Sequence, residues 1–119
     1  MDEKKYYRYV SNIMGVEEIK KYLTDQFHLP IEQVETMMPS FISTLGSHME
    51  TLEEALDVND PSEIGKAGHT IKGAFLNLGL EECARIAFDI EQSGKAGNAN
   101  ADYRSKVDSL HRCLEPVFK

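Results

Sequence analysis

The segment between residues 60 and 79 constrains the fold most, because its apolar residues recur at intervals of three and four. This spacing places them along one side of an α-helix and leaves the other side to solvent. The apolar side consists of Ile64, Gly68, Ile71, Phe75 and Leu78. The opposite side carries His69, Lys72, Gly73 and Leu76. The segment therefore predicts an amphipathic helix on which a histidine and a lysine face water.

Residues typical of helix ends frame this segment. Pro61 is tolerated in the first turn of a helix, and Asp60 before it can act as the N-cap by accepting a backbone hydrogen bond. Gly79 is a suitable C-terminal stop, because glycine readily adopts the left-handed conformation that ends many helices. We therefore expect a helix from Pro61 to about Leu78, and a following helix that ends before Gly94.

The rest of the chain also shows helical spacing. It contains no sustained alternation of apolar and polar residues and no Asn-Gly or Asp-Gly pair typical of a hairpin turn. One further helix is expected to begin at Pro39 and to end between Asp57 and Asp60. A last helix is expected to be capped by Asn100 and to reach about Val117. Four such helices joined by short loops predict an all-α fold, an up-and-down antiparallel four-helix bundle.

The first 38 residues carry shorter helical patterns. They divide into segments at 3–13 and 16–28 and a short piece that ends at Met38. We expect residues 1–38 to pack on the bundle as additional N-terminal helical segments, and residues 39–119 to form the bundle itself. A length of 119 residues is that of a single domain.

Composition and charge argue against several classes of partner. The net charge of −7 disfavours nucleic acid or an anionic membrane surface. No stretch approaches the roughly 20 apolar residues that span a bilayer. The charged start, Met1 to Lys5, is not followed by the apolar run of a secretory signal. We therefore expect a cytoplasmic protein in which Cys83 and Cys113 are reduced, partly buried thiols.

The histidine side of the central helix has the chemistry of a phosphoryl-binding site. Lys66 and Lys72 lie three residues before and after His69, so both ammonium groups can bracket the ring. A phosphohistidine carries negative charge on strong acceptor oxygens, which lysine binds as a flexible point charge. Gly73 costs about 1 kcal/mol relative to alanine inside a helix, a cost that is expected where a partner must approach the backbone closely.

The run His69-x-x-Lys72-Gly73, followed by Leu78-Gly79, resembles the signature of histidine-containing phosphotransfer (HPt) domains, and the likeness covers most of the chain. In that family a four-helix bundle exposes a histidine that shuttles a phosphoryl group between aspartates of receiver domains. The resemblance implies that His69 is the phosphoacceptor. It also implies that Lys72 steadies the phosphoryl oxygens and that Gly73 leaves space for the receiver.

Glu91 is the expected further member of the site. It lies 22 residues after His69 on the next helix, and an antiparallel neighbour brings that position back beside the histidine. A carboxylate that accepts a hydrogen bond from Nδ1–H fixes the tautomer and leaves Nε2 free to attack. Relay members of the family often have glutamine at the equivalent place, whereas the phosphotransfer domain of the chemotaxis kinase has glutamate, so both roles stay open.

The resemblance also implies the partners, which are receiver domains of response regulators or of hybrid histidine kinases. We expect Lys66, Leu76 and Gly79 to contact them. The receiver would bring its own Mg²⁺, and we expect this chain to be a monomeric phosphocarrier without a bound cofactor or metal. A glycine-rich nucleotide loop, which an ATP site would need, is missing. Two alternatives stay open: a helical interaction module that is never phosphorylated, and a metal-binding bundle, although the paired Glu-x-x-His spacing is missing.

Overall fold

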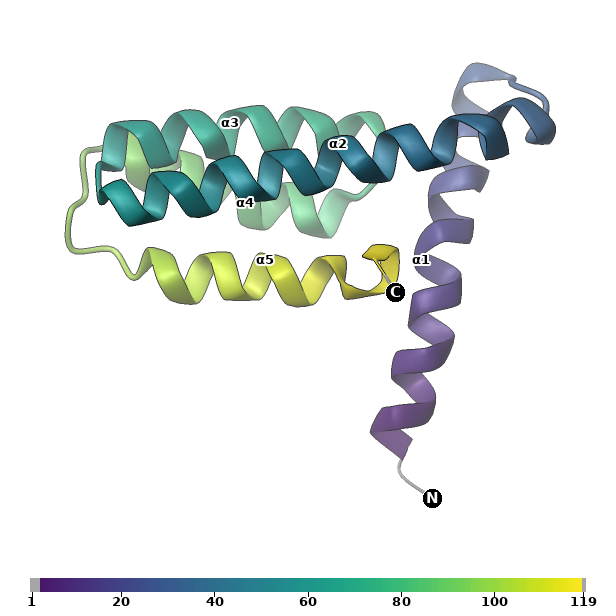
Figure 1. Cartoon of the computed structure of the whole chain (residues 1–119), viewed down its shortest axis with the longest axis horizontal. Coiled ribbons are helices and arrows are strands. Elements are labelled where there is room, and N and C mark those ends of the chain that lie inside the picture. The colour runs from purple at the N-terminus through teal and green to yellow at the C-terminus, as the bar shows by residue number, and fades with distance from the viewer. Residues whose placement is uncertain (1–2, 119) are drawn as a thin grey trace.

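The computed structural model describes the backbone of residues 3–118 and the side chains of residues 15–118. Within this part of the chain every regular element is an α-helix, in the order α1 (Glu3–Phe27), α2 (Ile31–Val58), α3 (Pro61–Asn77), α4 (Glu81–Lys95) and α5 (Tyr103–Phe118). Helices α2 to α5 lie side by side, each reversing the direction of the one before, and α1 crosses their end (Figure 1). The predicted up-and-down antiparallel bundle with an additional N-terminal helical part is confirmed.

Both predicted ends of α3 are confirmed. The Asp60 carboxylate accepts a hydrogen bond from the backbone N–H of Ser62 at 3.0 Å, as expected of an N-cap. Gly79 has a positive φ of 74°. The N–H of Leu80 behind it donates to the carbonyl of Phe75 at 2.9 Å, which is the closing bond of a Schellman motif. These ends fix the register of the helix, and with it the face that the histidine occupies.

The prediction that a helix begins at Pro39 is wrong, because α2 begins at Ile31 and runs through this proline. A proline inside a helix removes one hydrogen bond and costs about 3 kcal/mol. The turns before it bury Val34 and Met38 in the core, and each such side chain contributes about 1.5–3 kcal/mol, which offsets that cost. The expected division of the chain at residue 38 therefore falls within a helix and not in a linker.

The predicted break near residue 15 is wrong as well, because α1 is continuous. A Cβ added to Gly15 would lie 2.6 Å from the Cβ of Pro116 in α5, so this glycine permits a close contact between helices and does not end one. Further along α1, Ile19 and Leu23 are buried. The predicted packing of residues 1–14 lies outside the described side chains.

The start of the last helix and the end of α4 also differ from expectation. The carboxylate of Asp102, not the side chain of Asn100, caps α5 by accepting from the N–H of Ser105 at 3.0 Å. Asp102 is the capping residue because it lies directly before the first turn of α5, where the backbone N–H groups have no partner within the helix. Helix α4 includes Gly94 and ends at Lys95.

The core lies between the helices as the spacing predicts. The whole apolar side of α3 is buried, as are the five residues of α5 that face inward, which are Tyr103, Val107, Leu110, Leu114 and Val117.

No helix in the part of the chain that the structure describes is long and apolar enough to cross a membrane.

Helices α3 and α4 approach each other until their backbones touch. A Cβ added to Gly94 of α4 would lie 2.5 Å from the Cα of Gly65 in α3. A Cβ added to Gly68 of α3 would lie 3.0 Å from the backbone nitrogen of Glu91 in α4. The absence of side chains at these three glycines permits the contact. It brings the backbone of Glu91 directly against the helix that carries the histidine.

Candidate functional site

His69 lies on the solvent side of α3, as the spacing predicts. Its side chain is 63% exposed, whereas Ile71 and Phe75 on the opposite side of the helix are fully buried. The ring is therefore accessible, and the helix backbone below it is fixed by the core.

The carboxylate of Glu91 is the only buried charged group among the described residues, with 1% of the residue exposed. Its Oε2 lies 2.6 Å from Nδ1 of His69. The predicted hydrogen-bond distance between the two side chains is confirmed. The close approach of α3 and α4 at Gly68 places the two side chains within this reach.

Two lysines bind the same carboxylate. Nζ of Lys72 donates to Oε1 of Glu91 at 2.7 Å, and Nζ of Lys95 lies 2.8 Å from Oε2. The hydrogen bonds from Lys72 and then Lys95 hold the pKa of Glu91 down to about 2, against the effect of burial, with a smaller contribution from His69. Glu91 is therefore ionised at neutral pH and can only accept. Nδ1 of His69 must carry the proton of the shared hydrogen bond, which leaves the lone pair of neutral imidazole on Nε2.

The two predicted bracketing lysines differ in how firmly they are held. Nζ of Lys72 lies between Glu91 and the ring of Phe88, 5.1 Å from the ring centroid, and the side chain is 22% exposed. Lys66 is 71% exposed and forms an ion pair with Glu63 at 3.4 Å. Exposed pairs of this kind contribute little, so Lys72 has a fixed position and Lys66 has not.

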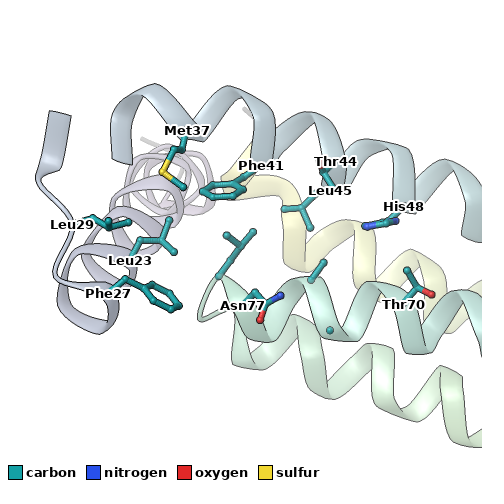
Figure 2. A pocket seen from close by; sticks show the side chains of 13 residues that line it. Leu23, Phe27, Leu29, Met37, Phe41, Thr44, Leu45, His48, Thr70 and Asn77 are labelled. Atoms are coloured by element: carbon teal, nitrogen blue, oxygen red, sulfur yellow. The ribbon is translucent and has the colours of Figure 1, made fainter. Parts of the chain in front are cut away.

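Gly73 opens the surface one helical turn from the histidine. A Cβ added there would meet no atom within 4 Å, so packing within the described residues does not require a glycine. Gly73 lines an apolar groove of about 720 Å³ between α2, α3 and the corner that joins α1 to α2. Figure 2 shows its apolar end, where Phe27 and Phe41 lie, and its more polar end at His48 and Thr70.

The other two predicted contact residues lie in different places. Leu76 is 49% exposed on the histidine side of α3. Gly79 lies about 15 Å further along the helix from His69, and a Cβ there would stand 2.5 Å from the ring of Tyr22 in α1. The structure therefore brings Leu76 to the histidine side and uses Gly79 in the turn that packs against α1.

Sequence reasoning missed Lys95 and Phe88. Lys95 follows Glu91 by four residues, the spacing at which these residue types pair on a helix, but the helix was expected to end before Gly94. Phe88 is 48% exposed beside Lys72, and an apolar residue on the solvent side of a helix is a weak signal in a sequence.

The pKa of Glu91 predicts a loss of stability in acid. The folded pKa of about 2 lies below the ordinary value of 4.5, so the ionised carboxylate stabilises the fold above pH 4.5. This contribution disappears as the pH falls from 4.5 towards 2. The shift corresponds to about 3 kcal/mol, which we reduce to about 1–2 kcal/mol because His69 and Lys95 are more than half exposed.

Unfolding of the wild type and of Glu91→Gln, measured at neutral and at acid pH, checks this prediction. The difference in free energy of unfolding should be largest at neutral pH and should shrink as the solution becomes acid. Glu63→Gln, which removes the carboxylate of an exposed ion pair, is the matched control and should show little difference at either pH. A Glu91→Gln difference that stays constant with pH would contradict the prediction.

The arrangement can present one nucleophilic nitrogen, in a fixed tautomer, to a group that arrives from solvent. Among the described residues, no group of three or more histidine, cysteine, aspartate or glutamate side chains is placed to hold a metal ion. At this site the structure places a histidine beside one carboxylate and two ammonium groups.

Comparison with known protein families agrees with this geometry. A family model described as the Hpt domain matches residues 36–117, from α2 to α5. Comparisons with curated proteins and with solved structures gave no match. The matched range includes the histidine, its carboxylate partner and both lysines. Because the family model spans well over half of the sequence, the chain belongs to the Hpt domain family.

Proposed function

We propose that this protein is a phosphocarrier of a two-component phosphorelay and that His69 is its phosphoacceptor. The observation that supports this most is the hydrogen bond from Nδ1 of His69 to the ionised, buried carboxylate of Glu91. It fixes the tautomer in which Nε2 of an exposed ring is the nucleophile. The donor and the acceptor are aspartates of receiver domains, and the receiver supplies the Mg²⁺ that neutralises phosphoryl charge.

The transfer step needs only the groups named above and the receiver. Nε2 attacks the phosphorus of the aspartyl phosphate in line, the N–P bond forms, and the P–O bond to the aspartate breaks with its electrons leaving on the carboxylate. The ring gains positive charge in this step, and the Glu91 carboxylate at 2.6 Å from Nδ1 stabilises it. The transition state is loose, so positioning and charge decide its rate. Transfer to a second receiver aspartate is the reverse reaction.

The charges around the ring favour an incoming phosphoryl group. Glu91 brings one negative charge, and Lys72 and Lys95 bring two positive charges within 2.8 Å of it. The cluster therefore keeps a net positive charge beside His69 in a chain whose total charge is −7. This supports a role for Lys72 in steadying the phosphoryl oxygens, with Lys95 keeping the buried carboxylate from repelling them.

The surface around the histidine suits a receiver domain. Leu76 and Phe88 are both about half exposed, on α3 and α4 respectively. Gly73 lines the groove without adding a side chain. Exposed apolar side chains, aromatic ones above all, are typical of the middle of a protein interface. We infer that the receiver docks over α3 and α4 at this place.

A phosphotransfer assay tests the proposal. A receiver domain phosphorylated on its aspartate is mixed with this protein, and the label on the chain is followed in acid and in base. We expect rapid transfer to a label that is labile in acid and stable in base, as a phosphohistidine is. A helical interaction module without this chemistry would bind its partner and remain unlabelled, which would overturn the proposal.

Lys72→Ala should slow the transfer more than it affects folding. Loss of a charge-assisted contact of about 1.5–3 kcal/mol corresponds to a decrease in rate of roughly ten-fold to a hundred-fold. The free energy of unfolding should fall by about 1 kcal/mol, because Glu91 keeps Lys95 and His69 as partners. Rates of label transfer and thermal unfolding measure the two effects.

The matched control for this variant is Lys66→Ala, which removes an ammonium group from the same helix and the same side. Because Lys66 is 71% exposed and its ion pair is with the exposed Glu63, its removal should change the transfer rate far less. Equal rates in the two variants would mean that the fixed position of Lys72 has no part in the transfer.

A further inference from the structure

The two cysteines form a facing pair between α4 and α5. Sγ of Cys83 lies 2.7 Å from Sγ of Cys113, and both are free thiols. A disulfide needs a separation of about 2.05 Å, so the two sulfur atoms would have to approach by only about 0.7 Å. Cys83 lies about two helical turns before Glu91 on α4, so the pair is separate from the charged cluster beside the histidine.

A cavity gives solvent access to this pair. It has a volume of about 480 Å³, and both cysteines line it together with residues of α1, of the turn at Gly79 and of α5. The volume is many times that of a water molecule, which occupies about 30 Å³ in the liquid, so a small oxidant can enter. Three carboxylate side chains also line the cavity, which are Glu18, Glu81 and Glu82. They repel anions, so the cavity favours a neutral oxidant.

The two thiols are not equivalent. Cys83 is 2% exposed, whereas Cys113 is half-buried. The thiol of Cys83 donates a hydrogen bond to the sulfur of Cys113, and this contact lowers the pKa of Cys113. The same contact, followed by burial, raises the pKa of Cys83. The thiolate is the reactive form of cysteine, so the accessible Cys113 is the thiol that attacks the oxidant. Cys83 is the resolving thiol, which attacks the oxidised Cys113.

We propose that Cys83 and Cys113 are a redox modification site, at which a neutral hydroperoxide converts the thiol pair into a reversible disulfide. The sulfur of Cys113 attacks the peroxide, the O–O bond breaks, and an alcohol, or water from hydrogen peroxide, leaves as Cys113 becomes a sulfenic acid. The sulfur of Cys83 then attacks that sulfur, the S–O bond breaks, and water leaves. The two thiols lose two electrons and two protons in total, and the peroxide gains them to leave as one alcohol (or water) and one water molecule.

The disulfide would tie α4 to α5 and close a loop that contains Glu91. Closing such a loop restricts the unfolded chain, and for a loop of this length the expected rise in the thermal midpoint is on the order of 10 °C. A thiol reductant reverses the step.

Intact mass spectrometry of the full chain tests the proposal. The reduced protein is treated with a small excess of tert-butyl hydroperoxide, and the remaining thiols are then alkylated. The wild type should lose the mass of two hydrogen atoms, resist alkylation, and recover both thiols with dithiothreitol. Its thermal midpoint should rise on oxidation and return on reduction.

Two variants separate the roles of the cysteines. In Cys83→Ala, the sulfenic acid on Cys113 should persist and be trapped by dimedone. In Cys113→Ala, the buried Cys83 should stay unoxidised under the same conditions. If either variant fails to fold, the mass of the oxidised wild type still decides the pairing. A wild type that gains oxygen atoms on Cys113 while Cys83 remains alkylatable, or that forms only intermolecular disulfides, would overturn the proposal.

Discussion

His69→Gln should abolish phosphorylation of this protein and leave its fold intact. Glutamine has no ring nitrogen to form an N–P bond, and no other group of the proposed site can replace it. The side chain is 63% exposed on the solvent side of α3, so its replacement should change the free energy of unfolding by about 0.5 kcal/mol or less apart from the hydrogen bond to Glu91. Mixing with a phosphorylated receiver, followed by measurement of the label on the chain, checks the result.

The matched control is His111→Gln. His111 is also a half-exposed histidine that contacts a glutamate, because its Nε2 lies 2.8 Å from Oε1 of Glu53. The cation that hydrogen-bonds Glu53 there is an arginine, Arg104, and not a lysine. We expect this variant to accept the full amount of label. Loss of label in His111→Gln, or normal labelling of His69→Gln, would refute the assignment of the phosphoacceptor.

Gly94→Ala should destabilise the bundle strongly and disrupt the histidine site. The added Cβ would lie 2.5 Å from the Cα and N atoms of Gly65 and from the carbonyl oxygen of Pro61, all of which are backbone atoms that cannot move aside singly. Overpacking of this kind costs about 1–3 kcal/mol and sometimes more, partly offset by the better helix propensity of alanine. We expect the thermal midpoint to fall by roughly 5–15 °C. Separation of α3 and α4 should also weaken the contact of Glu91 with His69.

Gly73→Ala makes the same substitution, glycine to alanine, at a place where it should affect phosphotransfer but not packing. A Cβ at Gly73 would meet nothing within 4 Å, so alanine should keep or raise the stability, by up to about 1 kcal/mol. Phosphotransfer from a receiver should nevertheless be slower if the glycine serves the close approach of the partner. Thermal unfolding and transfer rates of the two variants give both answers. Equal stability of Gly94→Ala and Gly73→Ala would contradict the proposed packing of α3 on α4.

Most of the helices could be predicted because the signals that define them are local. The apolar spacing of α3, its Asp60 cap and the Gly79 stop all act within a few residues, and the structure has all three. The errors at Pro39 and near Gly15 have a common cause. At both places a residue that disfavours a helix locally is overruled by burial against other helices, which a single segment of sequence does not reveal.

The sequence by itself determined which residues face solvent around the histidine, because helical periodicity depends only on spacing. It also led to Glu91, because an antiparallel neighbour returns along the same path and the offset of 22 residues could be counted. Only the tertiary structure decided how close the two helices come. That distance depends on Gly65, Gly68 and Gly94, which meet across the interface between α3 and α4. Their backbone atoms touch there, whereas the side chains of other residues would hold the two helices apart. Burial of Glu91, its ionisation by two lysines and the fixed tautomer of His69 all follow from that contact.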